Sequence, residues 1–243
     1  YLNGNINAFA LLESWANSEW FLNKDPLKEK ISLSVFKVSG ETNTDDLSPA
    51  ENAWTRPDIP LHSLCMLKFP RSGIVPDLDY KIGPLNQINK LKSLGYPVAY
   101  VGDVVGTGSS RKSATNSILW HFGEDIPYVP NKKTGGYCFG TKIAPIFFNT
   151  MEDSGALPIE MNVDSLETGQ VIDIYPYEKC TKEHNSNKII NKWDYNNETL
   201  LDSVRAGGRI NLIIGKSLTK KAQDTLKLSY PQVFIERKIS KKI

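Results

Sequence analysis

The order of apolar and polar residues predicts a helix and then a strand within the first forty residues. Between residues 7 and 22, apolar side chains recur every three or four positions, the spacing that gives a helix one apolar side. A polar link containing Pro26 follows. From residue 31 to residue 36 every second position is apolar, which is typical of a strand, and we expect Gly40 to end it.

Residues 41–60 show almost no periodicity and are rich in Thr, Asn, Asp and Pro. A connection of that length is unusual inside a compact domain unless it has a function. We therefore expect a long functional loop here.

A strand, a glycine turn and a helix are predicted near the middle of the chain. Residues 97–101 form a short apolar run that leads into Gly106 and Gly108, and a helical pattern covers residues 112–122. An earlier helix is bounded by Pro84, which suits a first helical position, and by Gly95 as a stop.

The remaining pattern predicts a mixed α/β order around one core. We expect an apolar run at 143–148, a turn or helix at 149–155, a strand at 171–175 paired with 189–193 across a polar loop at 178–187, a short helix at 198–205, a strand at 210–214, a last helix at 218–226 and a frayed basic tail at 238–242.

Composition places the chain among ordinary globular proteins. Of its 243 residues 40% are hydrophobic and 23% are charged, which excludes a disordered chain and suits one large domain with a helical attachment. The net charge of +2 makes neither nucleic acid nor a membrane surface an obligatory partner. No apolar run reaches the ~18 residues of a membrane span, so we expect a soluble, cytoplasmic protein. The start at Tyr1 without a Met suggests a piece of a longer chain.

Cysteine and histidine spacing predicts no metal site in this chain. Neither residue type occurs in a CxxC or other metal-ligand spacing, so we expect buried or idle thiols and packing or surface imidazoles. The residues concerned are Cys65, Cys138, Cys180, His62, His121 and His184.

The glycine turn is a candidate anion site. A helix that begins after residues 106–110 offers unpaired backbone N–H groups and the positive end of its dipole. The spacing matches neither GxGxxG nor GxxxxGK[ST], so dinucleotide and P-loop sites lack support. The planar guanidinium of Arg111 suits a carboxylate. Alternatively, Ser109 is only a helix cap and Arg111 a solvated charge.

A second polar group lies in the long loop, where residues 44–48 read TDDLS and Arg56 follows eight residues later. Aspartates in loops are usually turn formers that bind nearby backbone N–H groups. From residue types alone, that interpretation is the stronger one.

Five long strings nevertheless resemble the swivel domain of the bacterial aconitase B family. They are SGETNTDDLSPA at 39–50, WTRPDIPLH at 54–62, AYVGDVVGTGSSRKSATNS at 99–117, KIAPIFFNTMEDSGALPIE at 142–160 and VRAGGRI at 204–210. The resemblance implies a swivelling β/β/α domain over residues 28–230, preceded by the end of a helical region at 1–27 and followed by a tail or linker at 231–243. It covers most of the chain.

The resemblance also implies the chemistry of an aconitate hydratase, a hydro-lyase of the tricarboxylic acid cycle that interconverts citrate and isocitrate through cis-aconitate. In that family the first Ser of the SSR run is the alkoxide base that removes the carbon-bound proton, and the following Ser and Arg and the Arg of the RP dipeptide bind substrate carboxylates. Here these residues are Ser109, Ser110, Arg111 and Arg56, with Asp45 and Ser48 lining the site. Asp46 stands where many other aconitases have His, in agreement with the B type.

The implied cofactor is a [4Fe–4S] cluster, ligated in the family by cysteines on a later domain of the same polypeptide. We therefore expect no metal ligand in this chain, and no activity from the chain alone. The implied partners are a tricarboxylate substrate and the cluster-bearing domains. Two alternatives remain: a hydratase acting on 2-methyl-cis-aconitate, and a module that binds mRNA through the basic residues Lys216, Lys220, Lys221, Lys227, Lys238, Lys241 and Lys242.

Overall fold

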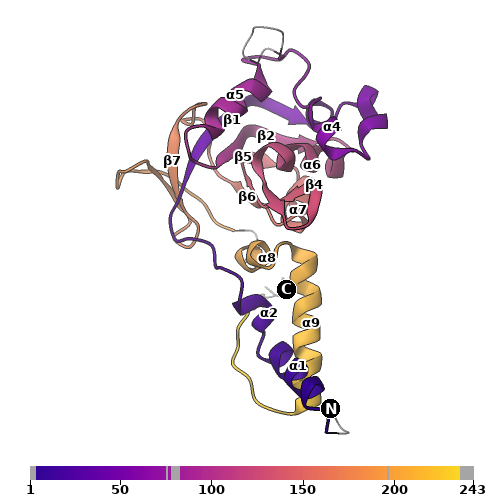
Figure 1. Cartoon of the computed structure of the whole chain (residues 1–243). Coiled ribbons are helices and arrows are strands. Elements are labelled where there is room, and N and C mark those ends of the chain that lie inside the picture. The colour runs from indigo at the N-terminus through magenta and orange to yellow at the C-terminus, as the bar shows by residue number, and fades with distance from the viewer. Residues whose placement is uncertain (1–3, 75, 78–82, 196, 236–243) are drawn as a thin grey trace, which may run out of the picture.

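The computed structural model describes residues 4–74, 76–77, 83–195 and 197–235 and divides into a sheet-containing head and a helical leg (Figure 1). The leg consists of α1 (Ile6–Ala16), α2 (Glu19–Leu22) and the long α9 (Arg209–Leu226). The chain thus leaves the leg for the head after α2 and returns to the leg at α9.

A mixed seven-stranded sheet forms the centre of the head, in the order β6-β5-β2-β1-β7-β8-β9. The first four of these strands run parallel to one another and the last three pair antiparallel. In chain order the strands are β1 (Ile31–Asn43), β2 (Val98–Thr107), β5 (Tyr137–Ile143), β6 (Leu157–Glu160), β7 (Val171–Tyr175), β8 (Cys180–Glu183) and β9 (Ile189–Lys192). A separate hairpin joins β3 (Glu124–Ile126) to β4 (Val129–Thr134).

Alternation along the central strands produces two apolar cores, one on each face of the sheet. Phe36 and Tyr100 pack on the face covered by α5, α6 and α7, whereas Leu33, Val35 and Val101 pack on the opposite face. The head helices are α3 (Thr44–Leu47), the 3-10 helix η1 (Ala50–Thr55), α4 (Ile59–Ser63), α5 (Pro84–Lys92), α6 (Arg111–Phe122), α7 (Pro145–Asp153) and α8 (Leu200–Ala206). The expected α/β fold is confirmed.

Close packing between Trp20 and α9 holds the leg together. A Cβ on Gly215 would lie 2.1 Å from the Trp20 ring, so only glycine fits at that position of the helix. The indole Nε1 of Trp20 also donates to Thr219 Oγ1 at 2.9 Å. The predicted N-terminal helical segment is confirmed, with a break at Ser18, whose φ is 59°.

The expected strand at residues 210–214 is wrong, because this segment is the start of α9. The residues that α9 buries include Leu212, Gly215, Thr219 and Ala222, which recur at helical spacing along the side that packs against α1 and α2. The periodicity becomes visible only when the apolar run is read together with the residues after it.

Two further expectations about strands are also wrong. Segments 171–175 and 189–193 do not pair directly, because β8 forms inside the expected loop and lies between them. Gly40 does not end β1 either. The strand continues to Asn43 through a bulge at Gly40, where φ is +77° and the backbone N–H donates to Asp103 Oδ2 at 2.6 Å.

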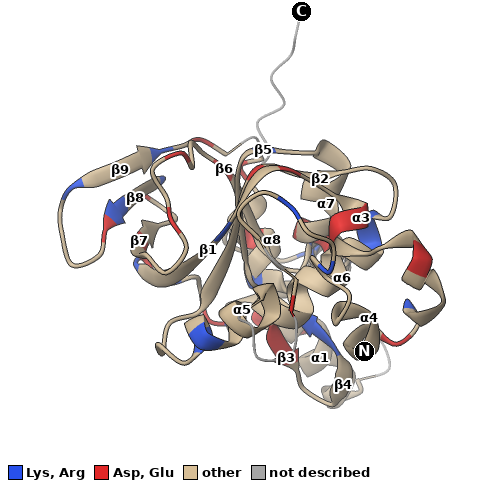
Figure 2. Cartoon of the chain, turned by 90° about the horizontal axis from the view of Figure 1, so that it is seen from above, with Lys and Arg blue, Asp and Glu red and all other residues tan. Residues whose placement is uncertain are grey.

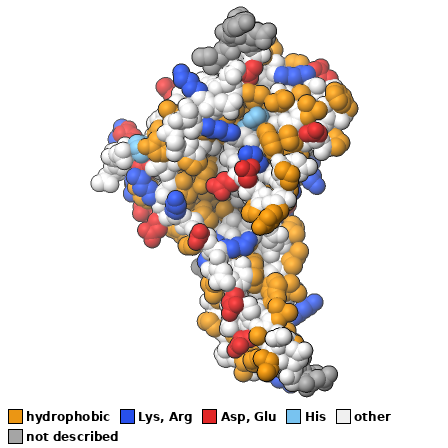
Figure 3. Space-filling model, viewed as in Figure 1, with side chains coloured by type: hydrophobic (Ala, Val, Ile, Leu, Met, Phe, Trp, Pro, Cys, Tyr) orange, Lys and Arg blue, Asp and Glu red, His pale blue; other side chains and the backbone are white. Residues whose placement is uncertain are grey.

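Charges of both signs are interspersed over the head seen from above (Figure 2). Apolar side chains gather in the region of α4 and along the leg (Figure 3), with Trp54, Leu61 and Leu64 exposed in the former. No helix among the described residues is long and apolar enough to cross a membrane. The expected fraying at 238–242, and three of the seven lysines named above, lie outside the described residues.

A buried carboxylate joins β1 to β7 and β8. Asp173 is fully buried and accepts hydrogen bonds from Ser32, His184 and the backbone N–H of Asn185, and Lys30 lies 2.9 Å away. Burial alone would raise the pKa of Asp173, but these four donors together hold it well below its usual value.

We predict that Asp173→Asn lowers the free energy of unfolding at pH 7 by about 3 kcal/mol, because the four donors lose a buried charged partner. A carboxylate with a depressed folded-state pKa stabilises the fold above its unfolded pKa of ~3.9 and loses that contribution as pH falls. Urea denaturation between pH 7 and pH 3 should therefore show a steeper loss of stability for the wild type than for the variant. Parallel curves would contradict the assignment.

Candidate active site

The candidate site lies where the parallel strands β1 and β2 end side by side. Asn43, the last residue of β1, is paired with Thr107, the last residue of β2. Helix α3 begins directly after β1, and the glycine turn and α6 follow β2. The carboxyl ends of adjacent parallel strands are a common place for a ligand site because loops from both strands meet there.

A capping box fixes the chain after β1. The Asn43 side chain accepts from the backbone N–H groups of Asp45 and Asp46, and Asp46 Oδ2 accepts in return from the Asn43 N–H at 2.9 Å. Asp46 also forms an ion pair with Arg71 at 3.0 Å. Asp46 is therefore engaged in structure, whereas the neighbouring Asp45 is exposed at the site.

Two glycines allow the turn after β2 to approach its neighbours closely. Gly106 has a φ of +80°, and a Cβ there would lie 2.1 Å from the Phe147 ring. Gly108 has a φ of +101°, and a Cβ there would lie 2.5 Å from Thr44 Oγ1. The same Thr44 hydroxyl accepts from the Ser110 N–H at 3.2 Å. The turn is thus attached directly to the start of α3.

Helix α6 presents its positive end at this turn. Ser110 precedes the helix, and its side chain makes no capping hydrogen bond. Arg111 is the first helical residue, is partly buried and has no hydrogen bond or ion pair with any residue in the described ranges. An unpaired cation and unpaired N–H groups together form a site that favours an anion.

The contact between Arg56 and Ser110 joins the long loop to the glycine turn. Arg56 Nη2 donates to Ser110 Oγ at 2.9 Å across 54 residues of sequence, and it lies 3.4 Å from the carbonyl oxygen of Ser48. Two arginines from separate loops therefore stand beside the same helix N-terminus. We call Arg56, Arg111 and the N–H groups at the start of α6 the carboxylate clamp.

A hollow of about 320 Å³ opens at the strand ends, lined by Glu41, Asn43, Thr44, Asp45, Thr107, Gly108 and Ser109. Ser109 is exposed there. The Thr107 hydroxyl donates to Glu41 at 2.5 Å, so one of the two acidic groups at the hollow is already occupied.

The six predicted site residues fall into three positions. Asp45 and Ser109 line the hollow, and Arg56, Ser110 and Arg111 lie beside the start of α6. The Ser48 side chain is fully buried behind the site, where its Oγ lies 2.7 Å from His62 Nε2; only its carbonyl oxygen contacts Arg56.

Sequence reasoning missed the supporting residues Asn43, Thr44 and His62. The role of Asn43 could have been predicted, because an Asn three residues before Asp46 matches the spacing of a capping box. No pattern in the sequence indicates the contacts of Thr44 and His62. Thr44 binds Ser110, which is remote in sequence, and His62 reaches Ser48 and Thr55 only through the fold of the loop that contains them. The packing interpretation of the histidines is correct for His62 and His121, which are buried.

Neither the histidines nor the cysteines supply a metal site within the described part of the chain. No three His, Cys, Asp or Glu side chains gather closely enough there to hold a metal ion. The cysteines are free; Cys138 and Cys180 are buried and Cys65 is partly buried. Burial raises the pKa of the Cys138 thiol to about 12, as expected for an idle thiol.

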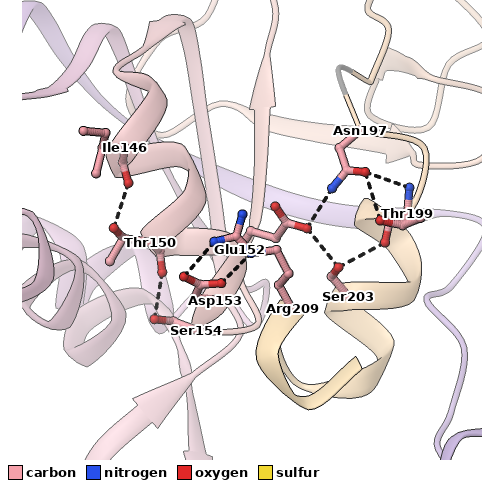
Figure 4. Close-up of polar contacts among 9 residues, drawn as sticks. All are labelled: Ile146, Thr150, Glu152, Asp153, Ser154, Asn197, Thr199, Ser203 and Arg209. Atoms are coloured by element: carbon pink, nitrogen blue, oxygen red, sulfur yellow. Dashed lines mark hydrogen bonds and ion pairs between the residues drawn. The ribbon is translucent and has the colours of Figure 1, made fainter. Parts of the chain in front are cut away.

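A larger cavity, about 580 Å³, lies between α7, α9 and the segment that precedes α8. Polar contacts join these elements (Figure 4): the buried Glu152 accepts from Asn197 at 3.0 Å and Ser203 at 2.9 Å, and Arg209 binds Asp153 through two hydrogen bonds. These contacts tie α7 to both helices that follow the sheet. None of the predicted site residues lines this cavity. The hydrogen bonds between Arg209 and Asp153 hold α9 of the leg to α7 of the head.

We predict that Gly106→Ala destabilises the chain more than Gly95→Ala. The two glycines have nearly the same φ, +80° and +83°, but a Cβ at Gly95 meets nothing within 4 Å. Gly95→Ala should cost about 1 kcal/mol of backbone strain, and Gly106→Ala a further ~1–3 kcal/mol from the clash with Phe147. Urea denaturation of both variants measures the difference. Equal destabilisation would mean that the turn is not held against α7.

A family model and the similar curated proteins indicate the same family for this chain. A family model described as "Aconitate hydratase 2 N-terminus" matches residues 33–242. The chain is 60% identical over 231 residues to the aconitate hydratase B of Pseudomonas aeruginosa, and 58% identical over 235 residues to that of Escherichia coli. These alignments cover 95% and 97% of this chain but 27% of each relative. The chain therefore spans about a quarter of the length of the curated relatives it matches.

Among solved structures, the chain resembles a 3-isopropylmalate dehydratase of Methanocaldococcus jannaschii with a TM-score of 0.53. The match covers 80% of this chain and 99% of that one at 19% sequence identity. At that identity the likeness supports a shared fold only.

Proposed function

Because the chain belongs to the aconitate hydratase 2 N-terminus family, we propose that it supplies one half of the substrate site of an aconitate hydratase. The reaction would be the interconversion of citrate and isocitrate through cis-aconitate in the cytoplasm. The three free cysteines agree with a reducing compartment. We further propose that residues 28–230 act as the swivelling domain, with 1–27 and 231–243 as connections to the rest of the enzyme.

The observation that most strongly supports this proposal is the contact between Arg56 and Ser110. It brings together two loops that are remote in sequence and places a guanidinium beside the N-terminus of α6, where Arg111 has no partner among the described residues. A tricarboxylate needs several cationic and N–H donors at once, and the carboxylate clamp provides them from separate, rigidly held segments.

We propose that Ser109, which is exposed in the hollow at the strand ends, acts on the carbon-bound proton of the substrate. As an alkoxide it would accept that proton and become a neutral hydroxyl, and in the reverse reaction it would return the proton. A serine hydroxyl has a pKa far above neutrality, so the alkoxide requires stabilisation by nearby dipoles and cations. The N–H groups at the start of α6 and the two arginines supply such a field.

The ligands of the [4Fe–4S] cluster do not fit the described residues of this chain, because the cysteines lie on separate elements and no three metal-binding side chains converge. We propose that the cluster and its cysteine ligands lie elsewhere in the full-length enzyme. This chain would then bind and orient the substrate and exchange its proton, and would be inactive alone.

The first prediction of this proposal concerns Ser109. In the full-length enzyme, Ser109→Ala should lower kcat by at least ~10²-fold, because the proton acceptor is lost while the clamp remains. Ser113→Ala, one turn further along α6, is the matched control and should retain activity. Full turnover of Ser109→Ala would contradict the role of Ser109 as the base.

A second prediction separates the two substrates that the clamp could accept. Carboxylates are common to cis-aconitate and 2-methyl-cis-aconitate, and one added methyl group in a site is worth only ~1–3 kcal/mol. We expect hydration of cis-aconitate to show the higher kcat/KM in steady-state assays of the full-length enzyme. A higher kcat/KM for the methylated substrate would assign the enzyme to that substrate instead.

A further inference from the structure

We propose that His62 is a positioning residue for Arg56 and that its imidazole fixes the loop that presents this arginine to the substrate. The inference rests on the proposed function, because it gives Arg56 a carboxylate to bind. It assigns to a buried histidine a role beyond the packing that the sequence predicts for it.

The hydrogen bonds of His62 define one tautomer. Thr55 Oγ1 donates its proton to the carbonyl oxygen of Asn52 at 2.7 Å, so it can only accept from His62 Nδ1, which lies 2.7 Å away. The other ring nitrogen, Nε2, then accepts from Ser48 Oγ at 2.7 Å. Burial, together with the charge of Arg56, lowers the pKa of His62, in agreement with a neutral ring.

These two contacts fix the backbone and side-chain support of Arg56. Thr55 immediately precedes Arg56 in the chain, and Ser48 provides the carbonyl oxygen that contacts the Arg56 guanidinium. The imidazole therefore holds the residue before Arg56 and the residue that supports its side chain. Both ring nitrogens are used, and the ring is 2% exposed. An apolar residue of similar size would fill the space but could not connect Ser48 to Thr55.

A second histidine extends the connection to the other side of the clamp. His121, near the end of α6, donates from Nε2 to the carbonyl oxygen of Ser63 at 2.9 Å, next to His62 in α4. Helix α4 is thus fixed both to the loop that carries Arg56 and to the helix that carries Arg111. Arg56 and Arg111 are held at a defined separation, which a substrate with carboxylates on a short carbon chain requires.

The test is a double-mutant cycle in the full-length enzyme, with kcat and KM measured for citrate and isocitrate. His62→Leu is made in the wild type and in an Arg56→Lys background, and Leu61→Ala, an exposed position of the same helix, is the control. Should His62→Leu fail to give folded protein, His62→Phe, which also lacks a ring donor and acceptor, takes its place in the same cycle. His62→Gln, which keeps an acceptor and a donor, should retain more activity than either apolar variant.

We expect His62→Leu to lower kcat/KM by ~10- to 100-fold in the wild type, mainly through a raised KM, and by less than about 3-fold once Arg56 is Lys. An equal loss in both backgrounds, no loss at all, or a fall in kcat with KM unchanged would overturn the proposal, because a purely structural defect reduces only the fraction of active enzyme. If Arg56→Lys alone leaves kcat/KM unchanged, the proposed role of Arg56 itself is wrong.

Discussion

Parallel pairing of β1 with β2 is the constraint on which the site depends. The two strands are buried on both faces, and their pairing through Asn43 and Thr107 brings two loops, far apart in sequence, to one edge of the sheet. A shift of one residue would turn Phe36 and Tyr100 away from their core and would also separate α3 from the glycine turn. The burial of apolar side chains that stabilises the two strands therefore also fixes the geometry of the polar groups at their ends.

Polar residues around the site divide into those that hold the backbone and those left open to a ligand. Asn43, Asp46 and Thr44 satisfy the backbone and side-chain groups of α3 and the turn, whereas the Arg111 guanidinium has no partner among the residues that the structure describes. Glycines allow this arrangement, because the backbone approaches Phe147 and Thr44 more closely than any side chain would permit. Rigid support around a small number of unpaired donors is what preorganised binding requires.

Local signals explain which parts of this structure could be predicted. The strand, glycine turn and helix over β2 and α6 follow from short-range apolar spacing and turn residues, and the structure agrees with them. Strand β8 is short and polar, so its place between β7 and β9 is decided by pairing with those strands rather than by its own sequence.

At the site, residues named from the resemblance lie together, but their support could not be read from the sequence. His62 acts through contacts with Ser48 and Thr55, which depend on how the long loop folds back on itself. Such contacts leave no periodic pattern. The helices α3, η1 and α4 within and just after residues 41–60 could not be predicted either, because each of them is too short to show an apolar repeat.

The most direct test of the central claim, that the two strand ends form a carboxylate clamp, is an NMR titration of this chain with citrate. If the strand ends form this clamp, the backbone amide signals of residues 109–113 and the guanidinium signals of Arg56 will shift together and saturate, with a Kd on the order of millimolar because only half of the site is present. A parallel titration with chloride at equal ionic strength should leave them in place. Citrate-dependent shifts confined to other surfaces, or no shifts at all, would mean that the strand ends do not form a carboxylate clamp.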